Sequence, residues 1–348
     1  MKKKIFCLCI IIILLCGCKS SKTGTIRLNS ADFFDIFYVN DQKIYYTNYD
    51  NSDLLFYVFD INNKKSEELG KIENPYIYSG DIAIIDGNIY FYCNELCQEK
   101  NREAVVCNHL VEIDTNNKVL SIIADDITYQ TLLYVDSIDH SLLSYKGVVE
   151  EMIAITYIDS FNIDEKDGFK RIIEKKYDYA TDEGEVILNI SAYDTKLYLL
   201  VEKSKEGIRE HKIEVYDSCG NALYEYKIEK AEIVSVLADG VVSKLVIQDN
   251  LCFIRNFSGN GILFELDNQD NIFLCKEELD ISENYTGNQN YLLLFSRYSG
   301  EMWLYNFEEN SFKDYMDDSD YLICGLADYS NMCILISNSD DLFYKKIE

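Results

Sequence analysis

The stretch DGNIYFYC (Asp86–Cys93), followed by HLVEIDTNNKVLSIIAD (His109–Asp125), carries the pattern that decides the fold. Asp-Gly before an alternating aromatic run is a strong signal for a tight hairpin turn. A second apolar strand then ends at Asp114, and a polar turn leads into a third strand. We therefore look for the same antiparallel unit elsewhere in the chain.

Similar aromatic or aliphatic strands recur along the sequence at a regular interval. Their first apolar residues are Ile44, Ile89, Leu142, Leu197, Leu251, Tyr291 and Met332. Successive separations are 45, 53, 55, 54, 40 and 41 residues. This period fits a four-stranded propeller blade of about 40 to 50 residues. The sequence predicts an all-β, seven-bladed β-propeller; a ring of six or eight blades and an open β-solenoid are the alternatives.

A second feature keeps step with the first. The strand after each of the first six anchors ends at an acidic or amide residue that opens a polar turn, as Asp and Asn side chains favour. These markers are Asp60, Asp114, Asp164, Asp217, Asp267 and Asn306. In the third unit Asp159 competes with Asp164. The separations from anchor to marker are 16, 25, 22, 20, 16 and 15 residues.

The last unit holds three strands before the chain ends at Glu348. Thr25–Leu28 is a strand-like segment left over before the first unit. We expect it to pair with Leu342–Ile347 and to close the ring, because closure removes exposed strand edges. Residues 25–348 are thus expected to form one domain.

The N-terminus has the form of an export signal. Three lysines precede an apolar run of 11 residues, Ile5–Leu15, which is the size of a signal-peptide core. Leu15-Cys16-Gly17-Cys18 follows and resembles the lipobox of bacterial lipoproteins. The resemblance implies a signal peptide at 1–17, a diacylglycerol-modified Cys18, a tether at 18–24 and an extracytoplasmic protein anchored to the cell membrane. An ordinary secretory signal or short anchor is the alternative.

The repeats also resemble the YWTD-like β-propeller lipoproteins of Gram-positive bacteria. Ile44–Asn48 (IYYTN) and Ile89–Cys93 (IYFYC) carry the likeness, and later units depart from it. This resemblance implies a fold and a surface location. It transfers no catalytic residue.

Composition limits the classes of partner. The formal charge is −27 and becomes −30 when the three signal-peptide lysines are removed. Such an acidic surface disfavours nucleic acid. The expected partners are the membrane, through the lipid, and a protein, peptide or glycan; the protein itself is expected to be a monomer without a cofactor.

Extra length in units two to four indicates where binding takes place. It falls in Asn94–Ala104, Lys146–Glu151 and Glu202–Glu210, which are predicted to be loops on one face. These segments gather basic residues in an acidic chain: Lys100, Arg102, Lys146, Lys203 and Arg209. The pattern predicts a mixed-charge contact surface, with plain hairpin extensions as the alternative.

Cysteines cluster in the first of these segments. Cys93 and Cys107 flank a hairpin and are predicted to face each other as a disulfide. Buried free thiols, or a zinc site of Cys93, Cys97, Cys107 and His109, are the alternatives, although the spacing is unusual for zinc. No G-x-S-x-G, H-E-x-x-H or P-loop motif is present.

The main prediction is therefore a non-enzymatic surface lipoprotein that binds through the propeller face of units two to four. The alternative is a propeller enzyme, a glycosidase or lyase, with paired carboxylates in the central funnel.

Overall fold

The computed structural model describes residues 24–26, 34–40, 43–50, 53–60, 63, 65–72, 77–98, 104–126, 134–238, 241–276, 279–281, 291–296, 302–306, 309, 311–314, 322–327, 333–337 and 342–346. The predicted signal peptide, Cys18 and the predicted tether as far as residue 23 lie outside these residues, as do Lys100 and Arg102.

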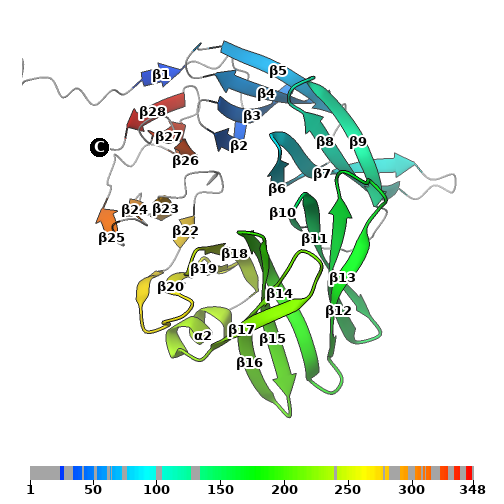
Figure 1. Ribbon diagram of the computed structural model, residues 1–348, viewed down its shortest axis with the longest axis vertical. Coiled ribbons are helices and arrows are strands. Elements are labelled where there is room, and N and C mark those ends of the chain that lie inside the picture. Colours follow the sequence, from blue (N-terminus) through cyan, green and yellow to red (C-terminus); the bar gives the residue numbers. More distant parts are fainter. Residues whose placement is uncertain are drawn as a thin grey trace, which may run out of the picture.

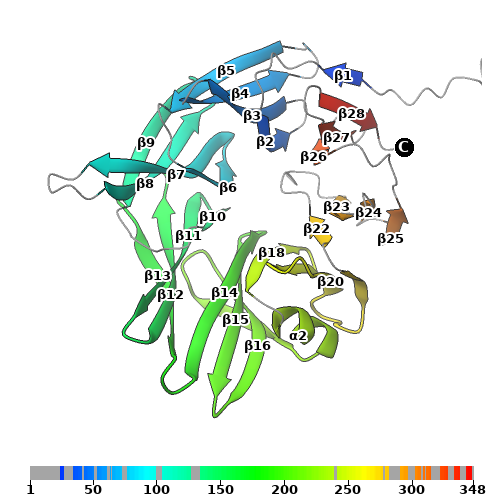
Figure 2. The ribbon, with the colours of Figure 1, turned by 180° about the vertical axis from the view of Figure 1, so that it is seen from behind.

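The described residues form antiparallel sheets that follow one another around a common centre (Figures 1 and 2). The first sheets consist of β2 (Phe34–Asn40), β3 (Lys43–Asp50), β4 (Asp53–Asp60) and β5 (Lys65–Ile72), then β6 (Ile77–Ile85), β7 (Asn88–Gln98), β8 (Ala104–Asp114) and β9 (Val119–Asp126). An eight-stranded sheet contains β10 (Tyr134–Ile138), β11 (Ser141–Glu150), β12 (Ile153–Asn162), β13 (Lys170–Asp178), β14 (Glu183–Tyr193), β15 (Lys196–Lys205), β16 (Ile208–Tyr216) and β17 (Ala222–Ile228). The later sheets consist of β18 (Val242–Gln248), β19 (Leu251–Asn256), β20 (Gly261–Glu265) and β21 (Ile272–Lys276), then β22 (Leu279–Ile281), β23 (Tyr291–Ser296), β24 (Met302–Asn306) and β25 (Ser311–Asp314). The predicted all-β class is confirmed.

The eight-stranded sheet consists of two four-stranded units joined at one end. Its inner strands β13 and β14 pair at Tyr177 with Gly184 and at Asp178 with Glu183. Gly184 has a φ of 126°, and a Cβ there would lie 2.2 Å from the carbonyl oxygen of Lys176. Only glycine permits this close crossing of the two strands.

The sheet formed by the chain ends has the order β1-β28-β27-β26. Its strands are β1 (Gly24–Ile26), β26 (Leu322–Ala327), β27 (Cys333–Ser337) and β28 (Leu342–Lys346). β1 runs antiparallel to β28, with Thr25 opposite Phe343. The first strand therefore lies on the outer edge of the sheet that holds the last strands.

The repeat positions match the strand order closely. Ile44, Ile89, Leu142, Leu197, Leu251 and Tyr291 each lie at or near the start of the second strand of a four-stranded unit, and β27, also a second strand, begins just after Met332. A polar side chain ends most third strands. At Asp114, for example, the carboxylate accepts hydrogen bonds from the backbone N–H groups of Asn116 and Asn117.

The prediction that Asp164 or Asp159 ends the third strand of unit three is wrong. β12 ends at Asn162, whose side-chain oxygen accepts the N–H groups of Asp164 and Glu165. Asn162 thus occupies the place that Asp114 has in the preceding sheet. Neither Asp159 nor Asp164 has that role, because Asp159 lies inside the strand and Asp164 lies in the turn itself.

Hydrophobic clusters lie between successive four-stranded units, with the eight-stranded sheet counted as two such units. One cluster joins Tyr45 and Phe56 of the β2–β5 sheet to Phe91 and Val111 of the β6–β9 sheet. Similar clusters join each following pair of units as far as β22–β25. Second strands are therefore covered on both faces, which explains unbroken apolar runs such as Leu197–Val201.

In the described part of the chain, a short helix interrupts the strands. α2 (Ala231–Ala238) follows β17 and buries Ile233, Val236 and Leu237 against the cluster shared with the β18–β21 sheet. Among the described residues no helix has the length and apolarity needed to span a membrane.

Candidate functional site

The predicted binding loops of units three and four are extensions of the strands. β11 and β12 remain paired from Ser141 with Asn162 to Glu150 with Ile153, and β15 pairs with β16 as far as Lys205 with Ile208. Tight turns close both hairpins, so added residues lengthen the ladder instead of forming a loop. In Figures 1 and 2 these hairpins extend beyond the other sheets at the lower edge of the molecule.

Lys146 is not a surface residue. It lies in β11 and is only 3% exposed. Its Nζ lies 3.9 Å from Oδ2 of Asp159 and 4.9 Å from the centre of the Phe169 ring. Burial lowers the pKa of its ammonium, against the opposing effect of Asp159. The prediction that Lys146 contributes to an exposed contact surface is wrong.

Arg209 and Lys203 lie in strands and are paired within the chain. The guanidinium of Arg209 lies 3.4 Å from Asp182 and 3.5 Å from Glu202. Glu202 is also within 3.2 Å of Nε2 of His211, and that hydrogen bond lowers the pKa of the Glu202 carboxyl. Lys203 lies 3.6 Å from Glu185.

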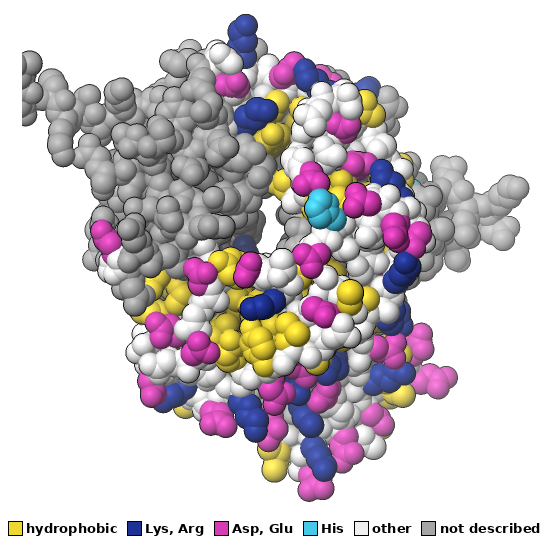
Figure 3. Space-filling model, viewed as in Figure 1, with side chains coloured by type: hydrophobic (Ala, Val, Ile, Leu, Met, Phe, Trp, Pro, Cys, Tyr) yellow, Lys and Arg dark blue, Asp and Glu magenta, His cyan; other side chains and the backbone are white. Residues whose placement is uncertain are grey.

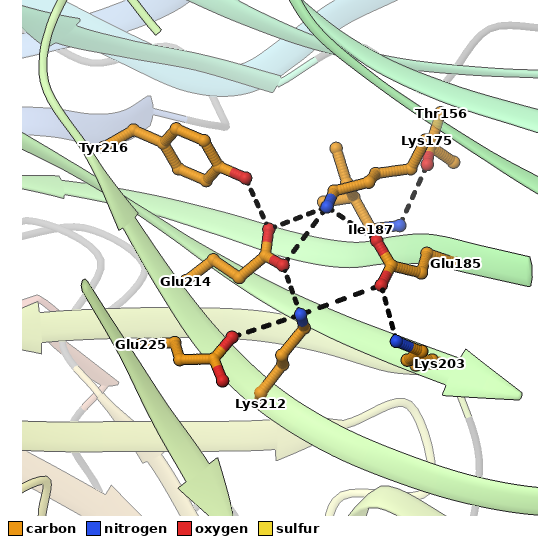
Figure 4. A network of polar contacts seen from close by, with 9 residues as sticks. All are labelled: Thr156, Lys175, Glu185, Ile187, Lys203, Lys212, Glu214, Tyr216 and Glu225. Carbon is orange, nitrogen blue, oxygen red and sulfur yellow. Dashed lines mark hydrogen bonds and ion pairs between the residues drawn. The ribbon is translucent and has the colours of Figure 1, made fainter. Parts of the chain in front are cut away.

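Lys203 is the outer member of a larger ion-pair network that crosses five strands (Figure 4). Its charged members are Lys175, Glu185, Lys203, Lys212, Glu214 and Glu225. Lys175 Nζ lies 2.7 Å from Glu185 and 2.9 Å from Glu214. The network therefore connects β13, the last strand of one unit, to β14 and β16 of the next.

Hydrogen bonds within the network outweigh the cost of burying its carboxylates. Burial would raise the pKa of Glu214, but Lys212, Tyr216 and Lys175 donate hydrogen bonds to it and lower the pKa below its usual range. The pKa of Glu185 is lowered in the same way, with Lys175 outweighing burial. The network is charged at neutral pH and joins five adjacent strands, β13 to β17.

The ends of these hairpins form one continuous surface. The N–H of Tyr179, in the β13–β14 turn, donates to the carbonyl of Met152 in the β11–β12 turn at 2.8 Å. On the other side, the Ser204 hydroxyl of β15 donates to the carbonyl of Asp182 at 2.7 Å. Hydrogen bonds thus join the β13–β14 turn to the β11–β12 turn on one side and to the end of β15 on the other.

We call this the hairpin-tip surface, and it exposes large apolar side chains. They are Val149 (64% exposed), Met152 (56%), Ile153 (38%), Tyr179 (52%) and Ile208 (65%). Exposed carboxylates border them at Glu150, Glu151, Glu183, Glu206 and Glu210. Exposed apolar side chains with a charged border are typical of a protein contact site.

Met152 is held in an unfavourable backbone conformation. Its φ is 75°, in the left-handed region that costs a side chain about 1 kcal/mol. The equivalent position of the β15–β16 turn is Gly207, with a φ of 78°. Glycine would serve the turn better, so a methionine here keeps an exposed apolar side chain at the expense of stability.

Of the five basic residues predicted to bind, Lys146, Lys203 and Arg209 form ion pairs within the chain, and Lys100 and Arg102 lie outside the described residues. The apolar tips were missed, although VVEEMI and KEGIRE place apolar residues directly beside two-residue turns. That position, where a hairpin ends, was the available signal.

The cysteine predictions depend on the register of β7 and β8. Cys93 lies opposite His109, and Cys107 lies opposite Glu95. The two cysteines are therefore diagonal neighbours, with Cα atoms about 7–8 Å apart, which exceeds the usual span of a disulfide. They do not face each other as expected, and the disulfide stays a prediction that the register disfavours.

The register also opposes the predicted zinc alternative. Cys93 and Cys97 are four residues apart in one strand, about 13 Å, too far for both to bind one ion. Within the described residues, no group of three or more His, Cys, Asp or Glu side chains is arranged to hold a metal.

No protein-family model matches this chain, and no curated protein matches it. Solved β-propellers do resemble its structure. An oligogalacturonate lyase from Vibrio parahaemolyticus superposes with a TM-score of 0.55 at 8% identity, over 93% of this chain and 96% of that one. YCF48 bound to D1 peptide gives 0.53 at 9% identity, over 95% and 97%. The β-propeller domain of the Trilobed protease from Pyrococcus furiosus gives 0.52 at 12% identity, over 92% and 95%.

At these identities the likeness concerns the fold. The neighbours include a peptide complex and an enzyme, so they do not select between binding and catalysis. The order of sheets, the clusters between them and these superpositions together establish that the chain has a β-propeller fold.

Proposed function

We propose that this protein is a lipid-anchored, extracytoplasmic β-propeller that binds a protein partner through the hairpin-tip surface and does not act as an enzyme. The observation that carries the proposal is the exposed apolar group at three hydrogen-bonded turns, including Met152 in a strained conformation. Partially ordered loops lose entropy on binding, whereas turns joined to their neighbours by hydrogen bonds lose less.

Charge indicates what the partner surface contains. The carboxylates of Glu150, Glu151 and Glu206 border the apolar tips, and the nearby Arg209 is already paired with Asp182 and Glu202. A complementary partner carries an apolar patch bordered by Lys or Arg. YCF48 bound to D1 peptide is a structurally similar propeller that binds a polypeptide, which supports the proposal that this fold can do so.

The finer architecture is part of the same proposal. We infer seven blades, with the eight-stranded sheet counted as two, and a ring closed by β1 on the last blade. The pairing of β1 with β28 and the two-pair junction between β13 and β14 support this count. Anchoring rests on Leu15-Cys16-Gly17-Cys18; Cys18→Ser should abolish incorporation of labelled palmitate, and unchanged labelling would contradict the anchor.

The binding proposal is tested with a variant that removes the tips without harming the fold. Met152→Gly relieves the strained φ and Ile208→Ser removes the other exposed tip, so the double variant should fold with unchanged or slightly higher stability. Phe257→Ser, at a residue 75% exposed on another sheet, is the matched control. Each form is used to recover partners from detergent-solubilised membranes of the native cell.

We expect one protein to be recovered by the parent and by Phe257→Ser, and its recovery to fall at least tenfold with Met152→Gly/Ile208→Ser. Equal recovery by the tip variant would refute the assigned surface. Binding of a glycan array by the parent, with the same loss in the tip variant, would refute a protein as the ligand.

The alternative function, a glycosidase or lyase with carboxylates in the central funnel, is tested separately. The purified chain is incubated with acidic and neutral polysaccharides, and the products are measured as new reducing ends or unsaturated sugars. Turnover that survives loss of the hairpin tips would replace the binding proposal.

A further inference from the structure

A cavity of about 640 Å³ lies between the first two sheets, far in the fold from the hairpin-tip surface. Its residues come from the start of β3, the end of β4, the start of β5 and the β8–β9 turn. In an antiparallel sheet these connections leave from the end opposite to the β3–β4 hairpin. The volume is in the range of about 300–1,000 Å³ typical of small-molecule sites.

The cavity has an apolar floor and a polar rim. Tyr45, Val58 and Leu69 form the floor, and all three belong to the hydrophobic cluster between these sheets. Asn63, Ser66 and Thr115 contribute amide and hydroxyl groups. The Tyr46 hydroxyl donates to Ser66 and the Thr115 hydroxyl donates to the carbonyl of Gly87, so both rim hydroxyls are hydrogen-bonded within the protein.

Basic side chains outnumber acidic ones around this cavity. Lys43, Lys65 and Lys118 line it together with Asp60 and Glu67, although acidic residues exceed basic ones by 27 in the whole chain. Lys118 forms an ion pair with Glu67 across the space between the two sheets. Lys43 and Lys65 differ from Lys118 in this respect.

Lys43 and Lys65 have no carboxylate partner among the residues that the structure describes, although Asp60 lies between them in the ladder. Asp60 accepts hydrogen bonds from the backbone N–H of Asn63 at 3.0 Å and from its side-chain amide at 2.7 Å. Lys43 and Lys65 line the cavity on either side of Asp60, and neither forms an ion pair with a residue that the structure describes. In a strongly acidic protein, two such lysines form a local site for an anion.

On the face shown in Figure 3, the described acidic side chains outnumber the basic ones, which is the opposite of the balance around this cavity. On the described part of that face, Lys and Arg side chains are scattered among more numerous Asp and Glu side chains. Lysines of the ion-pair network follow the same pattern, since each contacts at least one carboxylate.

We propose that this cavity binds a small anionic sugar, one that carries a phosphate or carboxylate group. The ammonium groups of Lys43 and Lys65 bind the anionic group, and Asn63 and Ser66 contact the sugar hydroxyls. The apolar face of the sugar ring packs on the floor formed by Tyr45, Val58 and Leu69. The partner bound by the hairpin tips is not involved, so either site can exist without the other.

The proposal is tested by calorimetric titration of the purified chain with glucose 6-phosphate, glucuronate and glucose at low salt. We expect the two anions to bind at least tenfold more tightly than neutral glucose, and their affinity to fall as salt screens the lysines. Which anion binds more tightly distinguishes a sugar phosphate from a sugar acid.

Two variants with the same change in charge complete the test. Lys43→Gln/Lys65→Gln should weaken the preferred anion at least tenfold, whereas Lys205→Gln/Lys227→Gln, at exposed positions of β15 and β17, should leave its affinity within twofold. An equal loss in both variants would show a general charge effect and overturn the site. The proposal is also overturned if the parent binds neither anion more tightly than glucose.

Discussion

Lysines of two regions in this molecule have opposite surroundings. In the ion-pair network, Lys175 and Lys212 are 15% and 18% exposed, and each contacts two or more carboxylates. At the cavity between the first two sheets, Lys43 and Lys65 are exposed and have no such partner among the described residues. The comparison separates lysines that hold the fold from lysines that remain available to a ligand.

The difference follows from the strands on which the residues lie. β13 and β14 diverge after two residue pairs, and charged side chains bridge the space between them. The first two sheets instead pack through Phe56 and Phe91, whose ring centres are 4.9 Å apart. Apolar packing already holds these sheets together, so the lysines at their edge are not required for cohesion.

Removal of Lys175 should have the largest effect on stability. Lys175→Met would leave Glu185 and Glu214 partly buried with fewer counter-charges, and breaking such a pair costs about 3 kcal/mol. We expect the free energy of unfolding in urea to fall by this amount. Lys176→Met, at an exposed neighbour that faces Glu174, should cost less than about 1 kcal/mol. Equal losses in the two variants would contradict the structural role of the network.

We expect the contribution of the ion-pair network to stability to decrease as the pH falls. The folded-state pKa values of Glu185 and Glu214 lie below the ordinary value of 4.5, so their contribution to stability is complete above that pH and is lost as the pH falls through the folded-state values. Glu185→Gln/Glu214→Gln should therefore lose less stability between pH 7 and about pH 3 than the parent, by about 1.5 kcal/mol.

The control for this pH experiment is Glu229→Gln/Glu232→Gln, which removes one exposed carboxylate just before α2 and one in its first turn. Its acid dependence should follow that of the parent in urea titrations at each pH. If the network variant and the control both retain the parent's profile, the carboxylates of the network do not govern acid stability.

The repeat could be predicted because its signals are local. Leu197–Val201 is apolar without interruption since sheets cover β15 on both sides, and Asp114 organises its own turn within three residues. Neither feature depends on distant partners. The order of strands and the positions of the second strands therefore followed from the sequence.

The sites could not be predicted in the same way because they depend on pairs distant in sequence. Lys146 is buried beside Asp159 and Phe169, and nothing in SLLSYKGVVE distinguishes it from an exposed strand lysine. An offset of two residues in the register separates Cys93 from Cys107. The cavity joins Lys43 to Thr115, which lie on different sheets.

Substitution of the two cavity lysines should change stability least, in contrast to substitution of Lys175. Lys43→Gln/Lys65→Gln removes two exposed ammonium groups that have no ion-pair partner among the described residues, so the free energy of unfolding should stay within about 0.5 kcal/mol of the parent. The same variant is the one expected to lose anion binding. Urea unfolding without ligand measures the first property, and unfolding with excess glucose 6-phosphate, which should stabilise only the parent, measures the second. A destabilised variant without ligand would place these lysines with Lys175 among the residues that hold the fold, and the distinction between the two regions would fail.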